Sequence, residues 1–165
     1  MLADTSSVWK DYEDIRFHRV EVSYEEGLRN VANMHMIRED ENGILWIGGG
    51  DQGLYRFNGY AALDIKDHIN KTQSNAIETI PVSFLIIDKD QNLWVGSPDG
   101  LYKIRKRDLK CAKIDLGEPL YEADYRNMIN RITEYKDTIL VGTLNGLYVL
   151  DRINAEVVGN ILMMA

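Results

Sequence analysis

The sequence predicts an all-β fold made of β-propeller blades: about three four-stranded antiparallel meanders that form an incomplete arc of a larger propeller. Three observations support this prediction. A multi-residue pattern occurs three times, the copies are 46 to 48 residues apart, and each copy alternates short apolar runs with turn residues. A repeat of this length with short strands and glycine-containing turns is typical of one propeller blade.

The three copies are DENGILWIGGGDQGLYRF (residues 40–57), DKDQNLWVGSPDGLYKI (88–104) and EYKDTILVGTLNGLYVL (134–150). Trp46 and Trp94 are 48 residues apart, and Leu140 takes the third place 46 residues further on. The copies also share one glycine after the second strand and one at the start of a Gly-Leu-Tyr triplet: Gly48, Gly96 and Gly142, and Gly53, Gly100 and Gly146.

Each copy predicts a blade in the same order. An inner strand comes first (34–37, 83–87 and 129–133), followed by a turn, and Asn42-Gly43 is a pair that tolerates positive φ. The second strand carries the tryptophan, and a glycine turn leads to the third strand. The fourth strand is expected at 61–66 and 112–116, while 121–131 is expected to be mainly a loop.

The spacing repeated in the three copies predicts structural roles for residues within each blade. Asp40, Gly43 and Asp88 are expected to shape the first turn. Trp46 and Trp94 are expected to fill the interfaces between adjacent blades. Tyr55, Tyr102 and Tyr148 form a third repeated set, for which packing between blades and stacking on a sugar ring both stay open.

Composition limits the classes of function. The chain has 165 residues and a net charge of −7, which argues against a nucleic-acid partner. The basic run KIRKRDLK (103–110) is interpreted as a solvated strand end or loop rather than a polyanion site. Cys111 is the only cysteine, so no internal disulfide or cysteine metal cluster is expected. No apolar run is long enough for a membrane helix, and no signal peptide is expected.

The first two copies resemble two-component regulator propeller repeats, whose pattern is roughly I-x-x-D-x-x-G-x-LWIGT-x-x-GL-x-R-Y/F-D. The segment 15–37, with SYEEGL at 23–28, is similar to the opening of the periplasmic sensor region of hybrid two-component histidine kinases. The resemblance covers residues 15–151. It implies a periplasmic sensor that recognises an oligosaccharide and passes a signal to a kinase module.

The predicted organisation is an N-terminal extension (1–14) and a partial propeller (15–165), with blades centred on 34–66, 82–116 and 129–158. The pattern varies between copies: the first has an extra residue in GGGDQG, and the third has Glu134 and Leu140 in place of aspartate and tryptophan. Because three blades form an open arc, the expected partners are further blades of a parent chain or a second copy in a homodimer.

The sequence indicates no catalytic, metal or cofactor site. His18, His35 and His68 share no spacing with a carboxylate, and the acidic turns lack the ligand pattern of an EF-hand. His35, Ser83 and Asn130, at the entry to the inner strands, are the candidates for ligand binding. Two alternatives stay open: a fragment of a sialidase-like or lyase-like propeller enzyme, and a pure oligomerisation scaffold.

Overall fold

The computed structural model describes residues 34–49, 53–73, 80–117 and 128–162. The predicted N-terminal extension and most of the segment 15–37 lie outside the described residues. So do residues 50–52 of the GGGDQG loop and most of 121–131.

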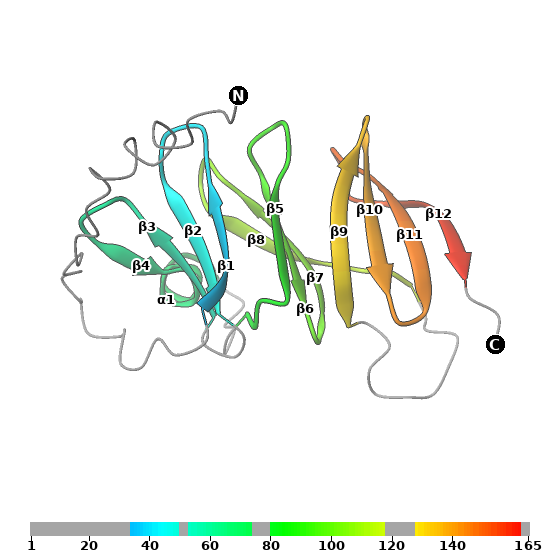
Figure 1. Ribbon diagram of the computed structural model, residues 1–165, viewed down its shortest axis with the longest axis horizontal. Helices are drawn as coiled ribbons and strands as arrows, with labels where there is room; N and C mark the ends of the chain where they lie inside the picture. The colour runs from blue at the N-terminus through cyan, green and yellow to red at the C-terminus, as the bar shows by residue number, and fades with distance from the viewer. Residues whose placement is uncertain (1–33, 50–52, 74–79, 118–127, 163–165) are drawn as a thin grey trace, which may run out of the picture.

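The described strands form three four-stranded antiparallel sheets, which lie side by side as three blades (Figure 1). In each blade, strands that are consecutive in the chain pair with one another. Blade 1 contains β1 (Met34–Glu39), β2 (Leu45–Gly49), β3 (Gly53–Phe57) and β4 (Ala62–Asp64). Blade 2 contains β5 (Phe84–Ile87), β6 (Leu93–Ser97), β7 (Gly100–Arg105) and β8 (Lys110–Ile114). Blade 3 contains β9 (Ile129–Tyr135), β10 (Thr138–Thr143), β11 (Gly146–Asp151) and β12 (Val157–Leu162). The predicted fold class is confirmed.

Turn residues with positive φ shape the hairpins of all three blades. Between the first two strands, φ is +73° at Gly43, +64° at Gln91 and +56° at Lys136. At the start of the third strand, φ is +93° at Gly53, +138° at Gly100 and +136° at Gly146. The second set is glycine in every copy because side-chain-bearing residues rarely adopt that conformation.

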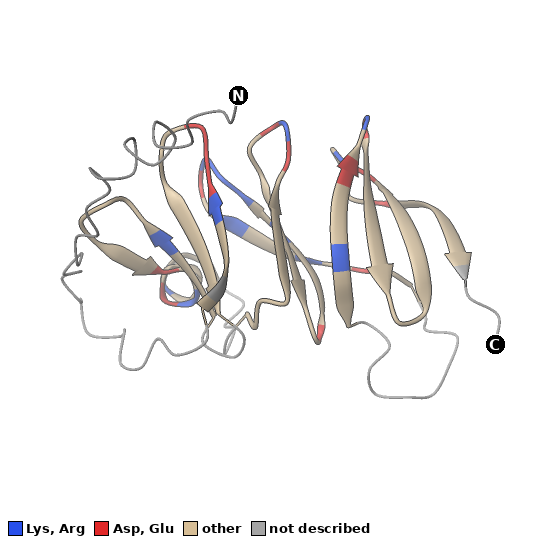
Figure 2. Cartoon of the chain, in the orientation of Figure 1, with Lys and Arg blue, Asp and Glu red and all other residues tan. Residues whose placement is uncertain are grey.

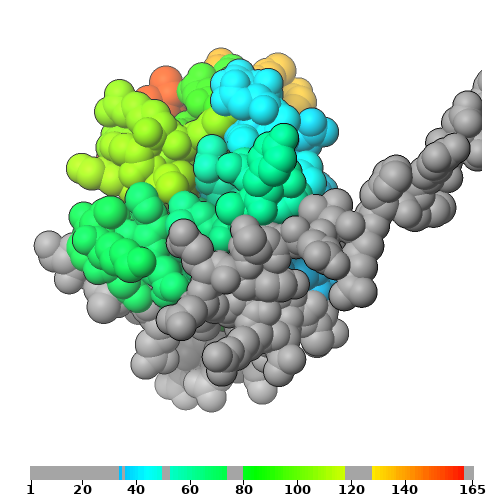
Figure 3. Space-filling model, turned by 90° about the vertical axis from the view of Figure 1, so that its left-hand side faces the viewer, coloured from blue at the N-terminus to red at the C-terminus, as the bar shows by residue number. Residues whose placement is uncertain are grey.

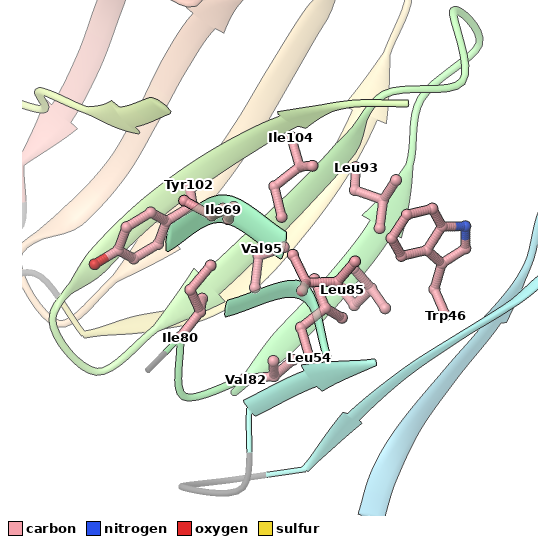
Figure 4. Packing of buried hydrophobic residues seen from close by; sticks show 11 residues of the cluster. Trp46, Leu54, Ile69, Ile80, Val82, Leu85, Leu93, Val95, Tyr102 and Ile104 are labelled. Carbon is pink, nitrogen blue, oxygen red and sulfur yellow. The ribbon is translucent and has the colours of Figure 1, made fainter. Parts of the chain in front are cut away.

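The core lies between the blades. Trp46 of blade 1 is fully buried in a cluster with Leu85, Leu93 and other apolar side chains of blade 2 (Figure 4). Trp94 of blade 2 is fully buried in a second cluster, which includes Ile139 of blade 3. Each tryptophan therefore joins its own sheet to the next one, and burial of one such side chain stabilises the fold by roughly 2–3 kcal/mol.

Two glycines let the backbone of one blade approach the next. A Cβ at Gly48 would lie 2.5 Å from Val82 Cγ1, and a Cβ at Gly96 would lie 2.6 Å from Ile129 Cγ2. A Cβ at Gly142 would meet nothing closer than 3.8 Å among the described atoms. Gly48 and Gly96 are thus contact points for a β-branched side chain of the following blade, and Gly142 is the same position with no such neighbour in the described part of the chain.

The predicted fourth strand of blade 1 is wrong in its second half. The segment 61–66 is extended only to Asp64, and the helix α1 (Ile65–Thr72) follows. Asp64 caps the helix by accepting a 2.8 Å hydrogen bond from Lys66 N, and Ile65 and Ile69 are buried on one side. These isoleucines are four residues apart, so the helical period was present in the sequence.

Candidate functional site

In blades 1 and 2, the turn between the first and second strands begins with a buried aspartate, Asp40 in blade 1 and Asp88 in blade 2. Asp40 Oδ1 accepts hydrogen bonds from Asn42 N (2.9 Å) and Ile44 N (3.2 Å), and Oδ2 accepts one from Trp46 Nε1 (3.1 Å). Asp88 repeats this arrangement, and its Oδ2 lies 2.9 Å from Trp94 Nε1. The aspartate fixes the turn and satisfies the indole N–H that would otherwise be buried without a partner.

Asp40 is held in its charged form. Burial alone would raise its pKa, but the hydrogen bonds from Trp46, Asn42, Ile44 and Lys106 outweigh burial, and the net effect lowers the pKa. Lys106 of blade 2 supplies the charge partner, with its Nζ 3.3 Å from Asp40 Oδ2. This ion pair crosses the junction between blades 1 and 2.

Blade 3 has a different first turn. Glu134 stands at the aspartate position, and its Oε2 accepts a 3.0 Å hydrogen bond from Lys89 N of blade 2. Lys89 Nζ also lies 2.5 Å from Asp137 Oδ1. The acidic groups of this turn therefore connect blade 3 to the preceding blade.

A basic side chain in the turn before the fourth strand bridges each of the two junctions. Lys106 of blade 2 pairs with Asp40 and Glu41 of blade 1. Arg152 of blade 3, 46 residues further on, pairs with Asp90 of blade 2. Arg152 is 5% exposed, whereas the Asp90 side chain is 53% exposed, so the pair is shielded from solvent on the arginine side. All of these turns lie at the upper end of the blades in Figure 2, where charged residues of both signs gather.

A pocket of about 770 Å³ opens between blades 1 and 2 at this end of the molecule. It lies among the first turns of both blades and the turn between β7 and β8. Figure 3 shows the residues around 105–110 (yellow-green) beside blade 1 (cyan). The lining is polar and charged apart from one leucine: Glu41, Asn42, Arg56, Asp90, Gln91, Asn92, Arg105, Lys106, Arg107 and Leu109.

The basic run 103–110 is more than the solvated strand end or loop that the sequence predicts. Its side chains contact both neighbouring blades: Lys106 Nζ lies 3.3 Å from Asp40 of blade 1, and Lys103 Nζ donates to the carbonyl oxygens of Arg152 (2.7 Å) and Ile153 (2.8 Å) of blade 3. The structure also brings Arg56, about 50 residues earlier in the chain, to the same pocket as Arg105 and Arg107. The packing of separate blades produces this cluster.

The three residues predicted to bind a ligand lie elsewhere. His35 is in β1, Ser83 directly precedes β5 and Asn130 is in β9. Asn130 is exposed, and Ser83 N donates a 2.8 Å hydrogen bond to Gly96 O. Ser83 and Asn130 are not among the described residues that line the pocket between blades 1 and 2. Their role in ligand binding stays a prediction.

The repeated tyrosines and His68 were also considered as candidates for ligand or metal binding. Tyr55, Tyr102 and Tyr148 are 6%, 6% and 4% exposed, so their rings are buried rather than presented to a ligand. His68 lies in α1. Within the described ranges, no three His, Cys, Asp or Glu side chains are grouped to hold a metal ion. No helix in those ranges is long and apolar enough to span a membrane.

Solved structures share this arrangement of blades. Two structures of the extracellular domain of BT4673 from B. thetaiotaomicron, described in one case as a one-component and in the other as a hybrid two-component system, match with TM-scores of 0.60 and 0.62 and 25% identity. They cover 76% and 79% of this chain. The extracellular domain of the system BT3049 from the same organism matches with a TM-score of 0.56 and 24% identity over 79% of this chain.

The chain resembles the extracellular region of a hybrid two-component system. The structural comparison thus agrees with the resemblance carried by the sequence repeats. The chain spans 16% of each of these structures' chains. No protein-family model matches the sequence, and no curated protein matches it significantly.

Proposed function

We propose that the chain is part of the sensor propeller of a hybrid two-component signalling protein and contributes to oligosaccharide recognition without catalysing a reaction. The observation that carries this proposal is the set of three repeated blades, whose structural relatives are extracellular domains of such systems. The same relatives support a periplasmic location.

The edge of blade 3 supports the proposal that further blades complete the arc. Four apolar residues lie on the same face of the sheet: Leu140, Leu147, Val149 and Ile161. Leu140 pairs with Val149 and Leu147 pairs with Ile161, and Leu147 and Val149 are two residues apart on β11. Ile161 is 67% exposed, and the other three are half-buried. The equivalent face of blade 2 carries Trp94 and Leu101, both fully buried against blade 3.

Gly142 lies on that open face and has room for a side chain from another blade. The proposed occupant is the next blade of the same propeller, because both glycines that precede it in the repeat receive a β-branched residue from the following blade. A second copy of the chain is the other candidate, and it favours a scaffold role. Light scattering after size-exclusion chromatography separates the two, since self-association gives a dimer mass.

Ligand recognition is tested with the purified chain and a panel of neutral and acidic oligosaccharides. A ligand that binds the folded state raises the melting temperature in proportion to its concentration relative to Kd. We expect at least one oligosaccharide to raise it by several degrees and to give a saturable calorimetric titration. If a folded chain binds no member of a broad panel, this part of the proposal fails.

A further inference from the structure

We propose that the pocket between blades 1 and 2 binds a saccharide that carries a carboxylate or sulfate group, and that Arg56 and Arg107 recognise the anionic group. This inference rests on the proposed function and adds the chemical class of the ligand and the place where it binds.

The repeat provides an internal reference for Arg56. Arg56 is the cross-strand partner of Trp46, as Lys103 is of Trp94. Lys103 stands over the Trp94 ring, 4.8 Å from its centre, and donates two hydrogen bonds to carbonyl groups in the β11–β12 turn of blade 3. A basic residue at this position therefore joins blade 2 to blade 3.

Arg56 does not make the equivalent connection from blade 1 to blade 2. Among the described residues it has no hydrogen bond or ion pair, although it is half-buried and lines the pocket. The equivalent junction between blades 2 and 3 is crossed by Lys103, Lys89 and Arg152. At this repeat position, Lys103 therefore crosses the junction between blades 2 and 3, whereas Arg56 faces the pocket at the junction between blades 1 and 2.

The acidic groups of the pocket are already engaged. Glu41 Oε1 lies 3.4 Å from Lys106 Nζ, and Asp90 pairs with Arg152. Arg105 is also occupied, because it donates two hydrogen bonds to Asp108, of 2.8 and 2.6 Å.

Arg107 is the second available guanidinium group. It is exposed and has no hydrogen bond or ion pair with any residue that the structure describes, and Asp108, which attracts it electrostatically, is hydrogen-bonded to Arg105. The pocket therefore offers two guanidinium groups that form no ion pair with a described residue, and both of its lining carboxylates, Glu41 and Asp90, lie beside a cation. A guanidinium group suits an anionic oxygen pair, because it presents several N–H donors in one plane.

The remaining lining fits the rest of a sugar. The amide side chains of Asn42, Gln91 and Asn92 can donate to and accept from hydroxyl groups. The volume of about 770 Å³ is within the range of small-ligand sites, roughly 300–1,000 Å³. No aromatic residue is among the described lining residues, so hydrogen bonds and ion pairs are expected to dominate over ring stacking.

The experiment is calorimetric titration of the chain with three tetrasaccharides: one neutral, one made of uronic acids and one sulfated. We expect the uronic or the sulfated sugar, or both, to bind at least about tenfold more tightly than the neutral one. Each of Arg56→Gln and Arg107→Gln should weaken that binding about 10- to 100-fold, the loss expected for a charge-assisted hydrogen bond. Added salt should weaken it further.

Lys113→Gln is the matched control. It removes the same charge, but Lys113 pairs with Asp99 near a different pocket and does not line this one. Its binding should equal that of the unmodified chain. Arg107 is in an exposed turn, so the Arg107→Gln variant should stay folded even where Arg56→Gln reduces stability. Circular dichroism verifies that both variants are folded.

The outcomes separate this inference from the proposed function. Equal binding of neutral and anionic sugars, or unchanged binding in Arg107→Gln, overturns the anion site and leaves oligosaccharide recognition intact. Failure of all three sugars to bind a folded chain that also binds nothing in the broad panel overturns both. Which anionic sugar binds identifies the group as carboxylate or sulfate.

Discussion

Replacement of Gly96 by alanine measures how closely blades 2 and 3 pack. The new Cβ would lie 2.6 Å from Ile129 Cγ2 and 2.8 Å from Ile129 Cβ. Carbon atoms in favourable contact are ~3.5–4.0 Å apart, so the blades must separate locally by about 1 Å. Overpacking of this kind costs about 1–3 kcal/mol.

Alanine also restricts the unfolded chain, which offsets about 0.4–1 kcal/mol of that cost. With an overpacking cost in the middle of its range, about 2 kcal/mol, the net destabilisation is expected to be about 1–2 kcal/mol, which lowers Tm by about 2–8 °C for a chain of this size. Urea unfolding followed by tryptophan fluorescence gives the free energy of unfolding, and calorimetry gives Tm.

Gly142→Ala is the matched control, because among the described atoms its Cβ would meet only those of Arg131, at 3.8 Å. Its stability should be unchanged or slightly higher. A further check is a double-mutant cycle: Gly96→Ala should cost less in an Ile129→Ala background, where the nearest clashing atom, Cγ2, is gone and Cβ remains. If Gly96→Ala and Gly142→Ala differ by less than about 0.5 kcal/mol, the close contact between blades is refuted.

Three further predictions concern individual polar and titratable groups. Asp88→Ala should lower the free energy of unfolding by about 2–3 kcal/mol, because it leaves the buried indole N–H of Trp94 without its acceptor; urea unfolding checks this. The folded pKa values of Asp40 and Asp99 are lowered below 3.8, so their stabilisation is fully present above pH 4 and is lost as the pH falls through the folded values. Tm measured from pH 6 to pH 2 should fall mainly below pH 4, and less steeply in Asp40→Asn; an unchanged slope would contradict this assignment. Burial raises the pKa of Cys111 to about 12, so a thiol reagent at pH 8 should label the folded chain far more slowly than the chain in urea. Equal labelling rates would show that the thiol is accessible.

The repeat made most of the fold predictable. The spacing of Trp46 and Trp94 indicated the period of the blades, the three copies of the pattern indicated their number, and the Gly-Leu-Tyr triplets indicated the third strands. The helix α1 was not predicted because the repeat suggested an outer strand after each copy, and such strands were expected at 61–66 and 112–116. The spacing of Ile65 and Ile69 was the signal that could have revealed it.

The pocket was beyond sequence analysis for a physical reason. Its charges come from turns of two different blades, and nothing in the repeat says which turns approach one another across a junction. From the sequence, Arg56 belongs to a predicted strand, and Arg105 and Arg107 belong to the run 103–110, which was interpreted as a solvated strand end or loop. Only the packing of Trp46 against blade 2 brings them together.

The row of blades also sets the order in which the chain opens. Blade 2 packs against a described blade on each of its two faces, and all of β6 is buried. In an array where each unit contacts only its neighbours, the inner unit gains two interfaces and the end units one. Amide hydrogens of β6 should therefore exchange with deuterium last, after those of the end blades, and fluctuations of the array should begin at its ends.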